Sequence, residues 1–235
     1  MIRRLAAEAL GAGLLVAAVI GSGIMATNLT SDVALALLIN AVSTIAALGV
    51  LIWTLGPTSG AHFNPAVTLV AAIRREVATG EAAAYLVAQG LGGVLGAGLA
   101  NAMFGLPAWH LSTTARTGPD LLLGEVVATA GLVWVIGALT RTGRGHLGPV
   151  LVPVWIGAAY FFTSSTSFAN PAVTFGRMFS DTFTGIEPGS VLPFMGAQLI
   201  GAGFGAILTE VFHPRPGRVP EPLDLPEPVH TRAGA

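Results

Sequence analysis

The chain has 235 residues, of which 53% are hydrophobic and 10% are charged, and its formal net charge is −1. Ordinary soluble domains carry about 25% charged residues. The sequence therefore has too little polar surface for a soluble globule and too little basic charge for a nucleic-acid-binding face. Cysteine and lysine are absent, which excludes disulfides, thiolate chemistry and Schiff-base chemistry. This composition is typical of a membrane protein with several spans.

Six apolar stretches are long enough, or nearly so, to cross a hydrocarbon core of about 30 Å. They are Leu5–Thr27, Val33–Leu55, Ala82–Met103, Leu121–Thr140, Leu147–Thr163 and Ser190–Phe212. Arginine placement predicts that both termini are cytoplasmic, because nine arginines then lie in inside segments and only Arg116 and Arg177 lie outside. The tail 214–235 is rich in proline and charge, and we expect it to be disordered.

The two halves of the chain resemble each other. FNPAVT, which contains Asn64, recurs as ANPAVT, which contains Asn170. Glu8 and Glu125 lie near the starts of the first and fourth spans, and Gln89 and Gln198 are each followed by glycines three and seven residues later. Three spans per half make this an inverted repeat, with halves at about 4–103 and 121–212 of a domain that covers residues 1–213. Such proteins place binding or conduction sites at the midplane, between the halves.

Each Asn-Pro-Ala triplet (Asn64, Pro65, Ala66 and Asn170, Pro171, Ala172) begins a run of about ten residues. These runs, Asn64–Ile73 and Asn170–Phe179, are too short to span a bilayer. Asparagine at the cap and proline at the first position favour helix starts. We therefore predict an all-α membrane protein of six transmembrane helices and two re-entrant half-helices that meet near the bilayer centre.

These motifs resemble the major intrinsic protein family, the aquaporins and aquaglyceroporins. The resemblance rests on SGAHFNPAVT at Ser59–Thr68 and FANPAVTFG at Phe168–Gly176, and it extends from about Arg4 to His213. It implies an aquaporin-like fold, a homotetramer with one pore per subunit, contact with the lipid of the inner (plasma) membrane, no cofactor and no enzymatic activity.

The residues themselves predict passive passage of small uncharged solutes. Two helix N-termini at one point create a positive potential that opposes cations. The side chains of Asn64 and Asn170 would donate hydrogen bonds to a solute. Backbone carbonyls of the loops would accept hydrogen bonds from the solute. The candidate residues are Gly60, Ala61, His62, Thr166, Ser167 and Phe168.

The family's narrowest point has four lining positions, which ungapped spacing from the two asparagines places at Thr44, Ala158, Ser167 and Val173. Val173 stands where the family has an arginine, so we expect a wide, uncharged constriction. This change, followed by GRMFSDTF, resembles bacterial aquaglyceroporins associated with arsenic resistance. Arsenous acid, an uncharged triol, is then a candidate solute; the alternative is a general water, glycerol or urea facilitator without a metalloid role.

The remaining polar residues allow two interpretations each. Glu8 and Glu125 serve either as a proton relay or as acceptors that hold the loops, and the repeat favours the second, together with Gln89 and Gln198. His62 is a proton gate, a metal ligand or a polar wall residue; we expect the last and no metal site.

Arg177 lies one turn beyond Val173. It either replaces the missing charge or pairs with Asp181 in the vestibule, and the pair is the expectation.

An ion-coupled secondary transporter is the rival class, since transporters also use inverted repeats. Such a protein needs an ion-coupling site, and no second acidic residue lies near either Asn-Pro-Ala loop. An intramembrane enzyme needs a nucleophile and base or a metal constellation, which the His, Asp and Ser spacing does not offer. The sequence therefore favours a channel.

Overall fold

The computed structural model describes residues 1–215, so most of the tail predicted to be disordered, 216–235, lies outside the described residues. Within the described range the chain is helical and contains no strand. The helices are α1 (Ile2–Leu29), α2 (Val33–Ser59), α3 (Pro65–Ile73), α4 (Thr79–Met103), α5 (Pro119–Arg141), α6 (Gly148–Phe162), α7 (Pro171–Arg177) and α8 (Pro188–Phe212), with a 3-10 turn at Gly145–Leu147 before α6.

The predicted spans and half-helices are confirmed as elements of this fold. Six helical segments are long and apolar enough to cross a membrane, and each contains most or all of one predicted stretch. The two short helices, α3 and α7, begin directly after Asn64 and Asn170. Their lengths of 9 and 7 residues are too short for a span.

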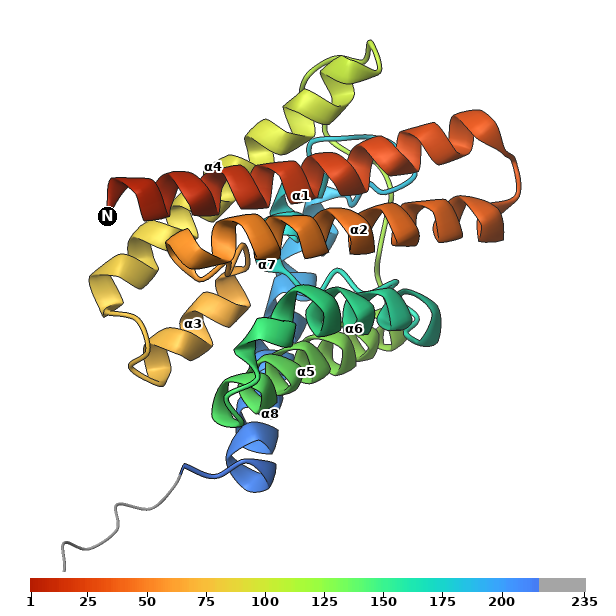
Figure 1. Cartoon of the computed structure of the whole chain (residues 1–235). Helices are drawn as coiled ribbons and strands as arrows, with labels where there is room; N and C mark the ends of the chain where they lie inside the picture. The colour runs from red at the N-terminus through yellow and green to blue at the C-terminus, as the bar shows by residue number, and fades with distance from the viewer. Residues whose placement is uncertain (216–235) are drawn as a thin grey trace, which may run out of the picture.

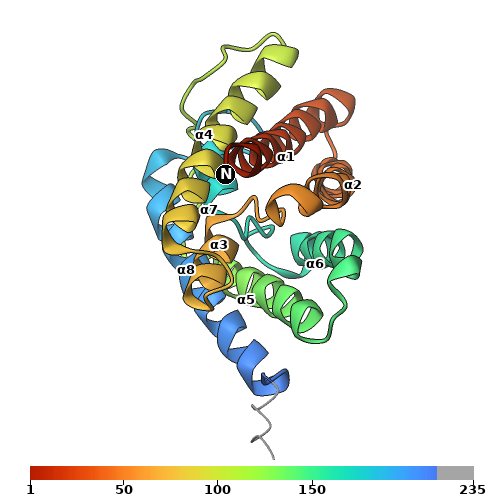
Figure 2. The same cartoon turned by 60° about the vertical axis from the view of Figure 1, so that its left-hand side comes forward.

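The two repeats have the same packing pattern. In the first half α1 packs against α2 and α4, and in the second half α5 packs against α6 and α8 (Figure 1). The halves join where α2 packs on α6, α3 on α8 and α7 on α4. Viewed roughly along several of the helices (Figure 2), α1 and α2 form one side and α5 and α6 the other, and the chain leading into the half-helices runs between them. Each half-helix is therefore held by helices of both repeats.

Paired glycines allow the long helices of each repeat to approach closely. A Cβ atom on Gly92 or Gly96 would collide with the backbone carbonyls of Ala9 and Gly13 on α1. In the second repeat the equivalent collisions are those of Gly201 with the Val126 carbonyl and of Gly205 with the Ala130 carbonyl on α5. The glycines three and seven residues after each glutamine are therefore packing residues, as small residues often are between membrane helices.

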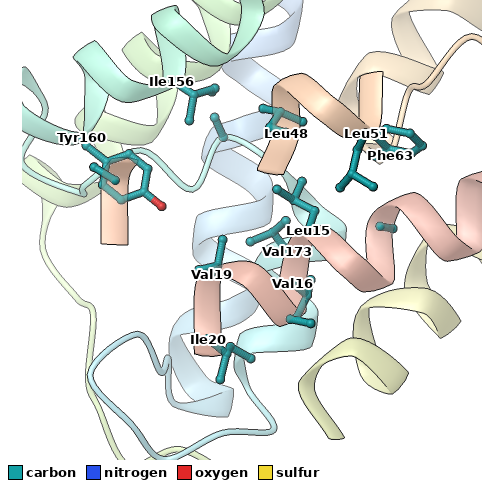
Figure 3. Packing of buried hydrophobic residues seen from close by; sticks show 14 of the residues in the cluster. Leu15, Val16, Val19, Ile20, Leu48, Leu51, Phe63, Ile156, Tyr160 and Val173 are labelled. Atoms are coloured by element: carbon teal, nitrogen blue, oxygen red, sulfur yellow. The ribbon is translucent and has the colours of Figure 1, made fainter. Parts of the chain in front are cut away.

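Buried apolar side chains from several helices meet inside the bundle. Figure 3 shows Leu15, Val19, Leu48, Ile156 and Val173 converging from α1, α2, α6 and α7. Large apolar side chains also cover much of the outer surface; Trp53, Leu91 and Leu192, for example, are each at least 60% exposed. An outer face of this kind suits contact with lipid.

The ion pairs made by arginine gather at one end of the bundle. The Arg4–Glu81 pair joins α1 to α4, and the Arg141–Glu210 pair joins α5 to α8, each at 2.5 Å. Arg74, at the end of α3, lies 3.9 Å from Glu210 and donates a hydrogen bond to a carbonyl of α8.

Candidate functional site

The two half-helices are capped in the same way. Asn64 and Asn170 are their N-cap residues, and each accepts a hydrogen bond through Oδ1 from the backbone N–H two residues later, of Ala66 and Ala172, at 2.9 Å. Proline occupies the first helical position of both, where a missing N–H costs nothing. The sequence thus dictates where each half-helix begins.

The same two side chains cross-link the repeats. Asn64 Nδ2 donates to the Ala169 carbonyl at 2.8 Å, and Asn170 Nδ2 donates to the Phe63 carbonyl at 2.9 Å. An amide NH2 group carries two hydrogens. One N–H of each asparagine is therefore used within the protein, and one remains to donate to a solute. Sequence reasoning missed this division, because it depends on how the two loops meet in space.

The loops that lead into the half-helices share an unusual backbone. Ala61 and Phe63 have φ of 51° and 48°, and their counterparts Ser167 and Ala169 have φ of 54° and 48°. Non-glycine residues in this left-handed region cost about 1–3 kcal/mol each, so the surrounding structure must hold them there.

Glu8 is one of the groups that hold these loops. Its carboxylate, which is fully buried, accepts hydrogen bonds from the backbone N–H groups of His62 at 3.0 Å and Phe63 at 2.7 Å. The Ser59 hydroxyl and the Gln89 amide donate to the same carboxylate at 2.6 and 2.7 Å.

Glu125 does the same in the second repeat. It is also fully buried, and it accepts from the N–H groups of Phe168 at 2.8 Å and Ala169 at 2.9 Å and from the Gln198 amide at 2.5 Å. With its N–H groups bound to a carboxylate, each loop leaves its carbonyls for other partners. This geometry is that of a loop-holding residue rather than of a relay.

A cavity of about 280 Å³ runs through the site. Arg74, Glu76 and Gly148 line it at one end; it then passes Asn64 and Asn170 and reaches Val173 and Arg177. The predicted acceptor residues that line it are Gly60, Ala61, His62, Ser167 and Phe168, and their carbonyls accept no hydrogen bond from residues 1–215. Thr166, the sixth predicted residue, is not part of the lining.

The predicted constriction needs one correction. Thr44, Ser167 and Val173 line the cavity, but Ala158 does not: it is exposed, on the face of α6 that points away. Tyr160, labelled in Figure 3, lines the cavity instead. Its hydroxyl lies 3.3 Å from Thr44 Oγ1. Two residues turn an α-helix by about 200°, so an ungapped count across the loop 163–169 selected the wrong face.

The expected pair of Arg177 with Asp181 is also wrong. Asp181 instead accepts hydrogen bonds from the backbone N–H and the hydroxyl of Thr113, at 2.9 and 3.0 Å. These bonds lower the pKa of Asp181 from its usual value. Arg177 is 4% exposed and lines the cavity, and its Nε donates to the Thr184 carbonyl at 2.5 Å.

Phe168 lies under the guanidinium of Arg177. The Arg177 Cζ atom is 3.3 Å from the centre of the Phe168 ring, and Arg116 Cζ is 5.1 Å from the same centre. Arg116 is itself held by the carbonyls of Gly185 and Phe183. The ring is thus in contact with both arginines that the sequence places on the outside.

His62 is a wall residue of the cavity. Its Nδ1 lies 3.0 Å from Thr68 Oγ1, and its ring packs edge-on against Tyr85. Within residues 1–215, no three His, Cys, Asp or Glu side chains are grouped so as to hold a metal ion.

Comparison with known proteins places this geometry in a family. The model of the major intrinsic protein family matches residues 1–168. Aquaglyceroporin AqpS of Rhizobium meliloti (strain 1021) is 54% identical over 200 residues, which are 85% of each chain. Aquaporin NIP1-1 of Zea mays is 34% identical over 158 residues, 64% of this chain and 56% of that protein.

A solved structure shares the fold. The X-ray structure of the aquaglyceroporin from Plasmodium falciparum superimposes with a TM-score of 0.67 at 19% sequence identity, over 90% of this chain and 95% of that one. With the family match over most of the chain, this places the six spans and two half-helices in a known architecture. The chain therefore belongs to the major intrinsic protein family and is a membrane channel rather than an enzyme.

Proposed function

We propose that the protein conducts small uncharged solutes passively, and that water and polyols such as glycerol are among them. The observation that carries the proposal is the cavity that passes between Asn64 and Asn170 and reaches Val173. The name aquaglyceroporin, carried by a relative 54% identical to this chain, supports the same solute class.

A neutral solute can exchange its hydration for contacts along this cavity. The second N–H of Asn64 and of Asn170 donates, and the free carbonyls of Gly60, Ala61 and His62 accept. Because hydrogen bonds to water are replaced by hydrogen bonds to protein, the net cost for a polyol is small. A cation meets the donors and the N-terminal ends of α3 and α7, and it also loses its hydration.

The constriction sets the size of the solute. Thr44, Tyr160, Ser167 and Val173 surround it. Because valine is smaller than the arginine that the family has at this position, we expect solutes larger than water to pass. We extend the proposal to trivalent metalloid acids such as arsenous acid, which at neutral pH is an uncharged triol and offers the same hydroxyl groups as glycerol. The alternative is a general water, glycerol and urea facilitator without a metalloid role.

The positions of the arginines support an orientation of the protein in the membrane. Arg4, Arg74 and Arg141 lie at one end of the bundle, with the ion pairs of α1, α5 and α8, and we assign this end to the cytoplasm under the positive-inside rule. Both termini are then cytoplasmic. From membership of the major intrinsic protein family, and not from the arginines, we propose that the protein lies in the plasma membrane as a homotetramer with one pore per subunit.

Purified protein in liposomes tests the proposal. Stopped-flow light scattering measures volume changes under osmotic gradients of glycerol, urea and arsenous acid, with protein-free liposomes as the baseline. We expect glycerol flux that is independent of a pH gradient and of a membrane potential. Uptake that requires a proton or sodium gradient would instead identify a secondary transporter. Glycerol flux without arsenous acid flux would select the general facilitator.

A further inference from the structure

Arg177 is a buried cation without a charged partner. Its side chain forms no ion pair within residues 1–215, and its single hydrogen bond runs from Nε to the Thr184 carbonyl. The two Nη nitrogens therefore have no partner in the part of the chain that the structure describes. Burial of an unpaired guanidinium is costly, and Arg177 lines the cavity, so the missing acceptors must come from what the cavity contains.

A second polar group at this end of the cavity also lacks a partner. The Ser167 hydroxyl is buried and makes no hydrogen bond within residues 1–215, and Ser167 lines the cavity. The hydroxyls of Thr44 and Tyr160 belong to the same lining and lie 3.3 Å apart. At this end of the cavity the Ser167 hydroxyl therefore has unused hydrogen-bonding capacity, whereas the hydroxyls of Thr44 and Tyr160 already bond to each other.

The guanidinium of Arg177 is held in a fixed plane. Phe168 stacks against it at 3.3 Å, and the Nε bond to Thr184 fixes its rotation. Arginine suits this arrangement, because its planar fork stacks on an aromatic ring while its Nη groups remain free to donate. A fixed donor binds a solute with less loss of conformational entropy than a mobile one.

We propose that Arg177 supplies, one helical turn beyond Val173, the positive charge that the constriction itself lacks. With Ser167 it forms a subsite for solutes that carry two or more hydroxyl oxygens, and it repels cations and hydronium. A displacement of one turn, about 5.4 Å, separates the charge from the narrowest level. The channel can then be wide at Val173 and still exclude cations. This inference rests on the proposed function.

The test compares Arg177→Gln with the wild type in proteoliposomes. Proton leak is measured with an internal pH dye under a potassium diffusion potential, and glycerol and water flux by light scattering. We expect Arg177→Gln to raise the proton leak by roughly tenfold, the effect of one charge several ångströms from the path, while glycerol still passes. Arg144→Gln is the matched control, since it removes the same charge from an exposed site and is expected to leave the leak unchanged.

Two further variants complete the test. In the double variant Val173→Arg with Arg177→Gln the charge moves back by one turn, and we expect the proton leak to return to the wild-type level while glycerol flux falls. Where Arg177→Gln is not recovered as folded protein, Arg177→Lys keeps the charge but loses the planar fork, so we expect a wild-type leak with a reduced ratio of glycerol to water flux.

The two levels of the proposal fail separately. A wild type without passive glycerol flux would refute the proposed function. A wild type that conducts glycerol, with an Arg177→Gln variant that leaks no more than Arg144→Gln, would leave the function standing and refute the role of Arg177. An unchanged ratio of glycerol to water flux in Arg177→Lys would also refute the role of Arg177 and leave the proposed function standing.

Discussion

Asn64 and Asn170 each donate a hydrogen bond to the carbonyl of the residue that precedes the other, at 2.8 and 2.9 Å. The two bonds join the half-helices of opposite repeats at one point. They also orient each amide, since one N–H is fixed by the partner loop and the second remains for a solute. Each asparagine is therefore both a cap and a cross-link, and under the proposed function it also donates to the solute.

Replacing Asn170 with aspartate separates these roles. The Asn170→Asp variant keeps an oxygen that caps α7, but it loses the N–H that binds the Phe63 carbonyl and sets two acceptors against each other. We expect a loss of stability of about 1–3 kcal/mol and a loss of glycerol flux, measured by thermal unfolding in detergent and by light scattering. Asn28→Asp, at an exposed position, introduces the same charge and is expected to change neither. Equal behaviour of the two variants would contradict the cross-link.

Substitution of Val173 by arginine tests the constriction. The long side chain would narrow the cavity at the level of Thr44 and Ser167, so solutes larger than water would be affected most. We expect glycerol flux to fall by roughly tenfold, equivalent to about 1.4 kcal/mol of barrier, and water flux to fall less. Light scattering with both gradients on the same vesicles measures the ratio. Val173→Leu adds bulk without charge and serves as the control; an unchanged glycerol flux in Val173→Arg would exclude Val173 from the constriction.

The contact between α1 and α4 gives a prediction about stability. A side chain at Gly92 would collide with the Ala9 carbonyl, whereas a Cβ atom at Gly90 meets nothing within 4 Å. Gly92→Val is therefore expected to cost about 1–3 kcal/mol through overpacking, visible as a lower melting temperature in detergent. Gly90→Val is the control, because it changes helix propensity in the same way at a position where a Cβ atom meets no other atom. If Gly92→Val and Gly90→Val have the same melting temperature, the close contact of α1 with α4 does not contribute to stability.

Asp181 gives a pH-dependent prediction. Its pKa is lowered by the hydrogen bonds from Thr113, so the ionised form is stabilised in the folded state. This contribution is complete above the unfolded-state pKa and is lost as the pH falls through the lowered pKa. We expect Asp181→Asn to melt slightly below the wild type at pH 7, and the difference to shrink as the pH approaches 3. Melting curves across this range would disprove the assignment if the difference were constant.

The elements of the fold were predictable because their signals are local. Short stretches of sequence are enough to identify the length of each span, the Asn-Pro start of each half-helix and the two glutamates. Each of these signals occurs in both repeats. Because of the same symmetry, the sequence alone predicts equivalent roles for Glu8 and Glu125.

The errors arose where a loop decides the geometry. Ungapped spacing across the loop 163–169 predicts Ala158 in the constriction, but Tyr160, two residues later, lines the cavity. Asp181 was assigned to Arg177 on helical spacing, but α7 ends at Arg177, so the spacing no longer applies beyond it. Arg177 stacks on Phe168, which lies on the other side of the Asn170 cap. No helical or strand periodicity in the sequence predicts a contact between these two residues.

The interlocked packing of α3 on α8 and α7 on α4 has a consequence for how temperature affects transport. Alternating access requires one repeat to move relative to the other. In this fold such a movement would break the contacts of α3 with α8 and of α7 with α4. Passage then involves only diffusion through a standing opening. Cooling should slow glycerol entry about as gently as it slows diffusion in water, without the steep decline that a conformational cycle imposes.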